Sequence, residues 1–278
     1  MREIREPGGR RANARRQRHF PGRDRGERPL VVCREGGGQV LIPIAVSVLA
    51  GAVASVAGFG IGSLLTPVLA PALGVRLAVA AVSIPHAAGT GLRLWRLRRA
   101  VDRRVLGWFG LASALGGLAG ALLHGETSER ALSAVFGGLL VLSGLAGFTG
   151  WTERLGLRGW GATVAGALSG LFGGMVGNQG GIRSAALLAF PLSPKAFVAT
   201  ATATALIVDG ARMPVYLVTS GAELLEHLPL IAGLVAGVVV GTLAGEGVLQ
   251  KLPERAFRRT VSLLLLLLGA YMLWRAAY

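Results

Sequence analysis

The sequence predicts an all-α, polytopic membrane protein made of two tandem repeats. Hydrophobic residues account for 52% of the chain and charged residues for 15%, whereas a soluble domain carries about 25% charged residues. Sliding the chain by 119 residues, the difference between Gly51 and Gly170, aligns two glycine-rich apolar segments. The aligned pairs include Gly51 with Gly170, Gly58 with Gly177, Gly62 with Gly181, Gly91 with Gly210 and Arg93 with Arg212. Tandem repeats of glycine-interrupted apolar segments are typical of secondary transporters.

Long apolar stretches supply the predicted membrane spans. Most of them approach the roughly 20 residues that an α-helix needs to cross a bilayer. They run over residues 40–57, 77–92, 105–123, 131–150, 161–176, 196–218, 228–249 and 257–274. Eight spans, four in each repeat, are therefore the base count.

A shorter apolar piece follows the first span of each repeat, over residues 60–73 and 180–192. Each piece has glycine on one side and proline on the other. At about 1.5 Å per residue, neither piece crosses a hydrocarbon core of about 30 Å comfortably. We predict that both are half-helices or re-entrant segments.

The domain boundaries follow from the repeat. Residues 40–150 form membrane repeat one, 151–160 a connecting loop and 161–278 membrane repeat two. Residues 1–39 are rich in arginine and glycine without an apolar period, which predicts a disordered leader. The alternative is that the true start lies near Val40 and the leader is a translation-start artefact.

Charge and cysteine content exclude several classes of partner and cofactor. The net charge of +15 lies mostly outside the predicted spans, so we expect a lipid bilayer rather than a nucleic acid as the partner. The single cysteine, Cys33, excludes a disulfide or a cysteine metal site within one chain. We predict neither a metal nor a cofactor, and leave a homo-oligomer open.

Basic residues predict the orientation of the loops, because cytoplasmic loops are enriched in Lys and Arg. Six arginines lie in residues 93–104, whereas the equivalent loop of repeat two holds Glu223, Glu226 and His227, and the bases move to residues 251–259. This swap favours two inverted repeats with five crossings each, in which the short pieces also cross and both termini lie outside. Eight crossings with both termini inside remain the alternative.

The two glycine-rich breaks are the predicted substrate site. Unwound backbone exposes N–H groups that cannot stay unpaired in hydrocarbon, and a helix N-terminus favours an anion. The predicted substrate-binding residues are Gly58, Gly60, Gly62, Ser63, Gly177, Asn178, Gln179, Gly180, Gly181 and Arg183. Glycines that merely permit tight turns are the alternative. Arg183 has only Leu64 as its repeat equivalent, and either contacts the anion or snorkels to the surface.

A second group of polar residues lies within the spans. Asp209 and Arg212 are three residues apart and can pair on one helix face, as a proton or substrate relay or as a structural pair. His86, beside Pro85, is a candidate for proton coupling, or bonds a carbonyl freed by the proline. Ser83, Thr200 and Thr202 are candidate pathway hydroxyls, although hydroxyls commonly bond back to their own helix.

At these breaks the chain resembles the sulfite exporter TauE/SafE family, also grouped with the toluene sulfonate uptake permeases. The similarity covers residues 40–275: a glycine-rich break, an apolar stretch that ends in proline, and an Ala/Val/Thr-rich span, each present twice. Ile61 and Ser63 interrupt the family's Gly-x-Gly-Gly-Gly pattern, and Asn178 and Gln179 depart from it further. The resemblance implies a multi-pass protein of the bacterial inner membrane that moves small sulfur-containing anions, such as sulfite or sulfonates.

The sequence therefore predicts a secondary carrier for a small anionic solute. An enzyme is not expected, because the spans hold no HExxH motif, no partner carboxylate for Asp209 and no nucleophile paired with a base. The alternative is a non-transporting membrane scaffold or biogenesis factor that docks partners through its glycine-rich helix faces.

Overall fold

The structure is a computed structural model that describes residues 37–151, 157, 159–249 and 253–278. Residues 1–36 of the predicted leader and most of the connecting loop lie outside this part. Its elements are α1 (Gly37–Ala57), α2 (Ile61–Leu73), α3 (Val75–Leu97), η1 (Arg98–Ala100), α4 (Arg103–Val105), η2 (Leu106–Gly110), α5 (Leu111–Glu126), α6 (Glu129–Thr149), α7 (Trp160–Val176), α8 (Gly180–Leu187), α9 (Pro194–Glu226), α10 (Leu228–Leu249) and α11 (Glu254–Ala277). All of these elements are helical, so the predicted fold class is confirmed.

Each of the eight predicted spans is helical in the structure, seven of them within long helical stretches. Seven helices in the described part are long and apolar enough to cross a membrane, and α2 and α7 are shorter apolar helices. Large apolar side chains point away from the bundle, as in Leu115 (62% exposed) and Leu122 (59%). Such an apolar exterior is stable where lipid covers it.

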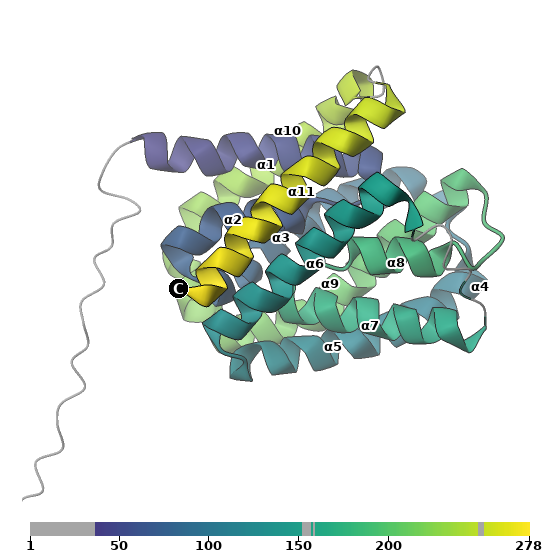
Figure 1. Ribbon diagram of the computed structural model, residues 1–278, viewed down its shortest axis with the longest axis horizontal. Coiled ribbons are helices and arrows are strands. Elements are labelled where there is room, and N and C mark those ends of the chain that lie inside the picture. Colours follow the sequence, from purple (N-terminus) through teal and green to yellow (C-terminus); the bar gives the residue numbers. More distant parts are fainter. Residues whose placement is uncertain (1–36, 152–156, 158, 250–252) are drawn as a thin grey trace, which may run out of the picture.

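The helices pair in a two-fold pattern between the halves. α1 packs on α10 and α5 packs on α7, so the first predicted span of each repeat contacts the third predicted span of the other. The equivalent helices α3 and α9 contact each other, as do α6 and α11. Figure 1 shows α6 and α11 side by side and running in opposite directions, with the C-terminus at the end where α6 begins. Inverted repeats would produce this arrangement.

Glycine ladders explain why two of these helix pairs pack so closely. A Cβ added to Gly116 or Gly170 would overlap the backbone of the facing helix in the α5–α7 pair, and one added to Gly51 or Gly241 would do so in the α1–α10 pair. Lipid tails cancel the hydrophobic attraction between helices, so close backbone approach at small residues drives their association. The glycine ladders thus allow the close approach seen in both pairs.

The predicted short pieces are half-length helices that begin at the two breaks. α2 spans 13 residues, and α8 spans only 8, which makes it shorter than the predicted stretch 180–192. Pro191 explains the difference, because proline disfavours helical backbone at the preceding residue. The next helix, α9, starts at Pro194 after Ser193, whose hydroxyl accepts a hydrogen bond from the Ala196 N–H at 3.3 Å.

Candidate functional site

The two breaks lie against each other inside the bundle. A Cβ on Gly62 would be 2.5 Å from the Gly177 carbonyl oxygen, and one on Gly180 would be 2.5 Å from the Phe59 Cβ. The Ser63 hydroxyl donates a hydrogen bond to the Asn178 Oδ1 at 3.4 Å. The structure therefore brings the first turns of α2 and α8 to one place, although 115 residues separate Ser63 from Asn178.

Positive backbone φ angles make glycine necessary at the breaks. Gly58 has φ 78°, Gly60 φ 128° and Gly177 φ 74°, a region that side chains with a Cβ rarely adopt. These three glycines end α1 and α7 and redirect the chain into α2 and α8. The tight-turn interpretation therefore holds for them. Gly62, Gly180 and Gly181 lie in the following helices instead, where Gly62 and Gly180 permit close contact between the breaks.

Two amide side chains at the second break are buried and have polar atoms without hydrogen-bond partners among the described residues. Asn178 is 5% exposed and Gln179 4%. Asn178 Nδ2 and both amide atoms of Gln179 have no partner among the described residues. The backbone beside them is held, since the Ser169 hydroxyl donates to the Gln179 carbonyl at 3.0 Å. Unpaired buried amides are costly, and a polar ligand would satisfy them.

Arg183 lies in the first turns of α8 and is 2% exposed. Its Nε and Nη1 atoms have no hydrogen-bond partner in the described part of the chain. The charges of Arg93 and Asp209 both act on it. A snorkelling arginine keeps its guanidinium in water, whereas the Arg183 side chain is enclosed by protein. The structure therefore does not support the snorkelling alternative.

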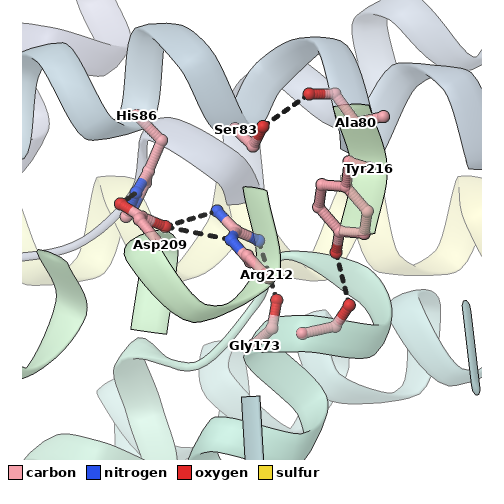
Figure 2. A network of polar contacts seen from close by, with 8 residues as sticks. Ala80, Ser83, His86, Gly173, Asp209, Arg212 and Tyr216 are labelled. Carbon is pink, nitrogen blue, oxygen red and sulfur yellow. Dashed lines mark hydrogen bonds and ion pairs between the residues drawn. The ribbon is translucent and has the colours of Figure 1, made fainter. Parts of the chain in front are cut away.

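A buried polar network joins α3 to α9 (Figure 2). His86 Nδ1 lies 2.6 Å from Asp209 Oδ2. Arg212 donates from Nε to Asp209 Oδ1 at 3.0 Å, and its Nη2 lies 2.7 Å from the same oxygen. The predicted pairing of Asp209 and Arg212 is therefore present, and His86 contacts a carboxylate of the other repeat rather than a freed carbonyl.

The same network holds the end of α7 in place. Arg212 Nη1 donates to the Gly173 carbonyl at 2.7 Å, and the Tyr216 hydroxyl donates to the Gly174 carbonyl, as Figure 2 shows. Arg212 also lies over the Tyr216 ring, 5.8 Å from its centre. α9 thereby fixes the last turn before the second break.

Arg93 is a buried residue whose position the predicted loop did not anticipate. It was placed in a cytoplasmic loop, but α3 continues to Leu97 and Arg93 is only 7% exposed. Its Nη1 donates to the Ala54 carbonyl. Ala54 and Gly173 are 119 residues apart, as are Arg93 and Arg212, so each arginine binds the equivalent carbonyl ahead of a break. The Arg93–Arg212 match within the repeat was the signal that could have identified this role.

The candidate pathway hydroxyls all make hydrogen bonds to backbone groups of the protein. Ser83 donates to the Ala80 carbonyl at 2.6 Å and Thr202 to the Val198 carbonyl at 2.7 Å. Thr200 Oγ1 accepts from the Asp102 N–H at 3.0 Å, which ties α9 to the loop before α4. The structure therefore favours bonding of Ser83 and Thr202 to their own helices, and an anchoring contact for Thr200.

A cavity of about 530 Å³ reaches α8. It lies between α6, α8, α11 and Phe59 of the first break, and its polar side chains are Ser143, Ser184, Ser262 and Arg258. A Cβ on Gly181 would lie 3.0 Å from the Ser143 hydroxyl. The first turn of α8 thus has one face toward this cavity.

In the described part of the chain, no group of three or more His, Cys, Asp or Glu side chains is placed to hold a metal ion. The polar centre is instead cationic and amide-rich, with donors that lack protein acceptors. Such a centre suits an anion.

Fold and site together define a polytopic α-helical membrane protein with a buried, cation-rich centre at two crossed helix breaks. The chain belongs to the sulfite exporter TauE/SafE family, whose family model matches residues 43–272. The predicted family resemblance is therefore confirmed, and it makes the protein a member of a membrane transporter family. Comparison with curated proteins and with solved structures gives no significant match.

Proposed function

We propose that this protein is a secondary carrier that moves a small sulfur-containing oxyanion, such as sulfite or a sulfonate, across the cell inner membrane. The observation that carries this proposal is Arg183, which is 2% exposed and has two nitrogen atoms without a hydrogen-bond partner among the described residues. A charged side chain inside the membrane is expensive unless it is paired or meets a substrate. An oxyanion would supply the missing acceptors.

The surroundings of Arg183 supply further donors for such an anion. Asn178 Nδ2 and Gln179 Nε2 lack acceptors among the described residues, and both residues immediately precede α8 in the sequence. α2 and α8 both start at the crossing of the breaks, and a helix N-terminus offers free N–H groups and a partial positive charge. The two helix N-termini and the buried polar side chains together form a site that favours an anion.

The position of this site between the repeats supports alternating access. Ser63 of repeat one bonds Asn178 of repeat two, so an anion at the crossing contacts both halves at once. In transporters built from repeats, rocking of one half against the other opens the site to each side in turn. The cavity that reaches Gly181 between α6 and α11 is the proposed route from one side.

Flux measurements test the proposal directly. Purified protein in liposomes is given radiolabelled sulfite, sulfate, thiosulfate or methanesulfonate, with the membrane potential and the proton gradient set independently, and protein-free liposomes serve as the control. Saturable flux of one of these anions is the expected result. Absence of flux for all of them, from protein shown to be folded, would overturn the anion carrier and favour the scaffold alternative.

A further inference from the structure

The buried formal charges of the bundle do not balance. Among the described residues, three arginines and one aspartate are buried as charged side chains: Arg93 (7% exposed), Arg183 (2%), Arg212 (1%) and Asp209 (0%). Three guanidinium groups against one carboxylate leave two positive charges without a counter-charge. Uncompensated charge in a low-dielectric interior is strongly unfavourable.

The repeat shows which two charges lack a partner. Arg212 has its own carboxylate, because Asp209 lies one helical turn before it and bonds it at 2.7 Å. The equivalent position in repeat one, 119 residues earlier, is Thr90, one turn before Arg93. Thr90 is fully buried, and its hydroxyl has no partner in the described structure. Repeat one thus keeps the arginine but lacks the acid.

Arg183 is the second uncompensated charge. Its repeat equivalent, Leu64, is buried and apolar, so only repeat two carries a charge at this position. The positive charges of Arg93 and Arg183 repel each other, and the negative charge of Asp209 attracts both. The Asp209 carboxylate, however, is already bonded to Arg212 and His86. A single shared carboxylate cannot neutralise three guanidinium groups.

We propose that the transported substrate is a dianion, and that Arg93 is a specificity residue that selects it. This inference rests on the proposed carrier function. Two negative charges would neutralise the excess, whether both lie on one group, as in sulfate, or on two groups, as in a short sulfonate that also carries a carboxylate. A monoanion would leave one buried positive charge unpaired, so the site discriminates against it.

Binding to the purified protein tests the charge of the substrate separately from transport. Isothermal titration calorimetry compares anions that resemble each other in shape but differ in charge, namely sulfate with methanesulfonate and sulfoacetate with ethanesulfonate. In at least one pair, we expect the dianion to bind about tenfold more tightly than the monoanion, which corresponds to about 1.4 kcal/mol of binding free energy. The two pairs also distinguish a dianion with one charged group from one with two.

A substitution taken from the repeat provides the sharper test. Thr90→Asp places a carboxylate where repeat two has Asp209, and Thr90→Asn is the matched control of equal size without charge. Thr90→Asp should lose the preference for dianions and bind the monoanion of each pair at least as well, whereas Thr90→Asn should keep the wild-type preference. Arg183→Leu, which installs the residue of repeat one, should shift the preference in the same direction if Thr90→Asp does not fold.

The outcomes separate the two proposals. Equal affinity of the wild-type protein for both members of each pair would overturn the dianion inference alone, as would an unchanged preference in both folded Thr90→Asp and Arg183→Leu. Failure of the folded wild-type protein to bind any of the four anions would overturn this inference, and absence of flux for sulfite and the other anions in liposomes would overturn the proposed function as well.

Discussion

At the scale of residues, the structure concentrates unpaired donors where the repeats differ. Arg183, Asn178 and Gln179 stand in repeat two where repeat one has Leu64, Phe59 and Gly60. All three polar side chains are buried and have atoms without partners in the described chain. The shared residues build the crossing, and the residues that differ supply the polar atoms without partners.

Arg183→Gln should weaken substrate affinity without a comparable loss of folded protein. Hydrogen bonds to a charged group contribute about 1.5–3 kcal/mol, so we expect the half-saturating concentration for flux to rise by roughly 10- to 100-fold. Concentration-dependent uptake into proteoliposomes measures this value. Arg103→Gln is the control, since Arg103 is exposed, and an unchanged half-saturating concentration in Arg183→Gln would remove Arg183 from the site.

Gly181→Leu should abolish transport while membrane insertion stays intact. A Cβ at this position would lie 3.0 Å from the Ser143 hydroxyl, and the rest of a leucine side chain would enter the cavity that reaches the start of α8. Gly91→Leu is the control, because a Cβ there meets nothing within 4 Å. Flux per correctly inserted protein is the measurement, and wild-type flux in Gly181→Leu would show that this face of α8 is not on the substrate route.

Asp209→Asn should lower the stability of the fold and also reduce transport. Asp209 is fully buried and contacts both His86 and Arg212. Removing one partner of a buried ion pair costs about 3–5 kcal/mol, because the other charge remains unpaired. Unfolding measured in a mild detergent compares the stability of this variant with that of Ser83→Ala. Ser83→Ala is the control because it loses only a hydrogen bond within its own helix. Equal stability of the two variants would contradict a structural role for the pair.

At the scale of elements, the sequence predicts helices well and contacts between distant helices less well. The eight apolar stretches each became a helix, because long apolar runs in a bilayer have few alternatives. The contact between His86 and Asp209 depends on how α3 packs on α9, which no local spacing reveals. Arg93 was missed because a run of arginines after Leu92 indicates a loop, whereas α3 continues and its guanidinium group turns back to Ala54.

The glycine ladders make a prediction for helix pairs. Gly170→Ala places a Cβ against the Ser113 carbonyl of α5, a backbone group that cannot move aside without separating the two helices. We expect a loss of about 1–3 kcal/mol in stability, the cost of overpacking a well-packed contact. Gly210→Ala, where a Cβ meets nothing within 4 Å, is the control. Thermal unfolding in detergent measures both, and equal midpoints would mean that α5 and α7 do not need this close approach.

At the scale of the whole molecule, inverted repeats and uninverted repeats predict different sides for the same loops. Figure 1 places α4 and the start of α11 at one end of the bundle and the C-terminus at the other. Basic residues near α4 and near the start of α11 would then face the cytoplasm together. In the uninverted arrangement of eight crossings, the loop after α9 and the C-terminus are cytoplasmic, and the start of α11 is outside.

Single cysteines distinguish the two arrangements. In a Cys33→Ser background, which lacks cysteine, the exposed positions Arg99, Glu226, Arg255 and Tyr278 are replaced one at a time by cysteine. Inverted repeats predict that a membrane-impermeant maleimide labels positions 226 and 278 in intact cells, and positions 99 and 255 only after permeabilisation. Position 99 is inside in both arrangements and is the control. Labelling of position 255, but not 226 or 278, in intact cells would establish eight crossings and contradict the inverted arrangement.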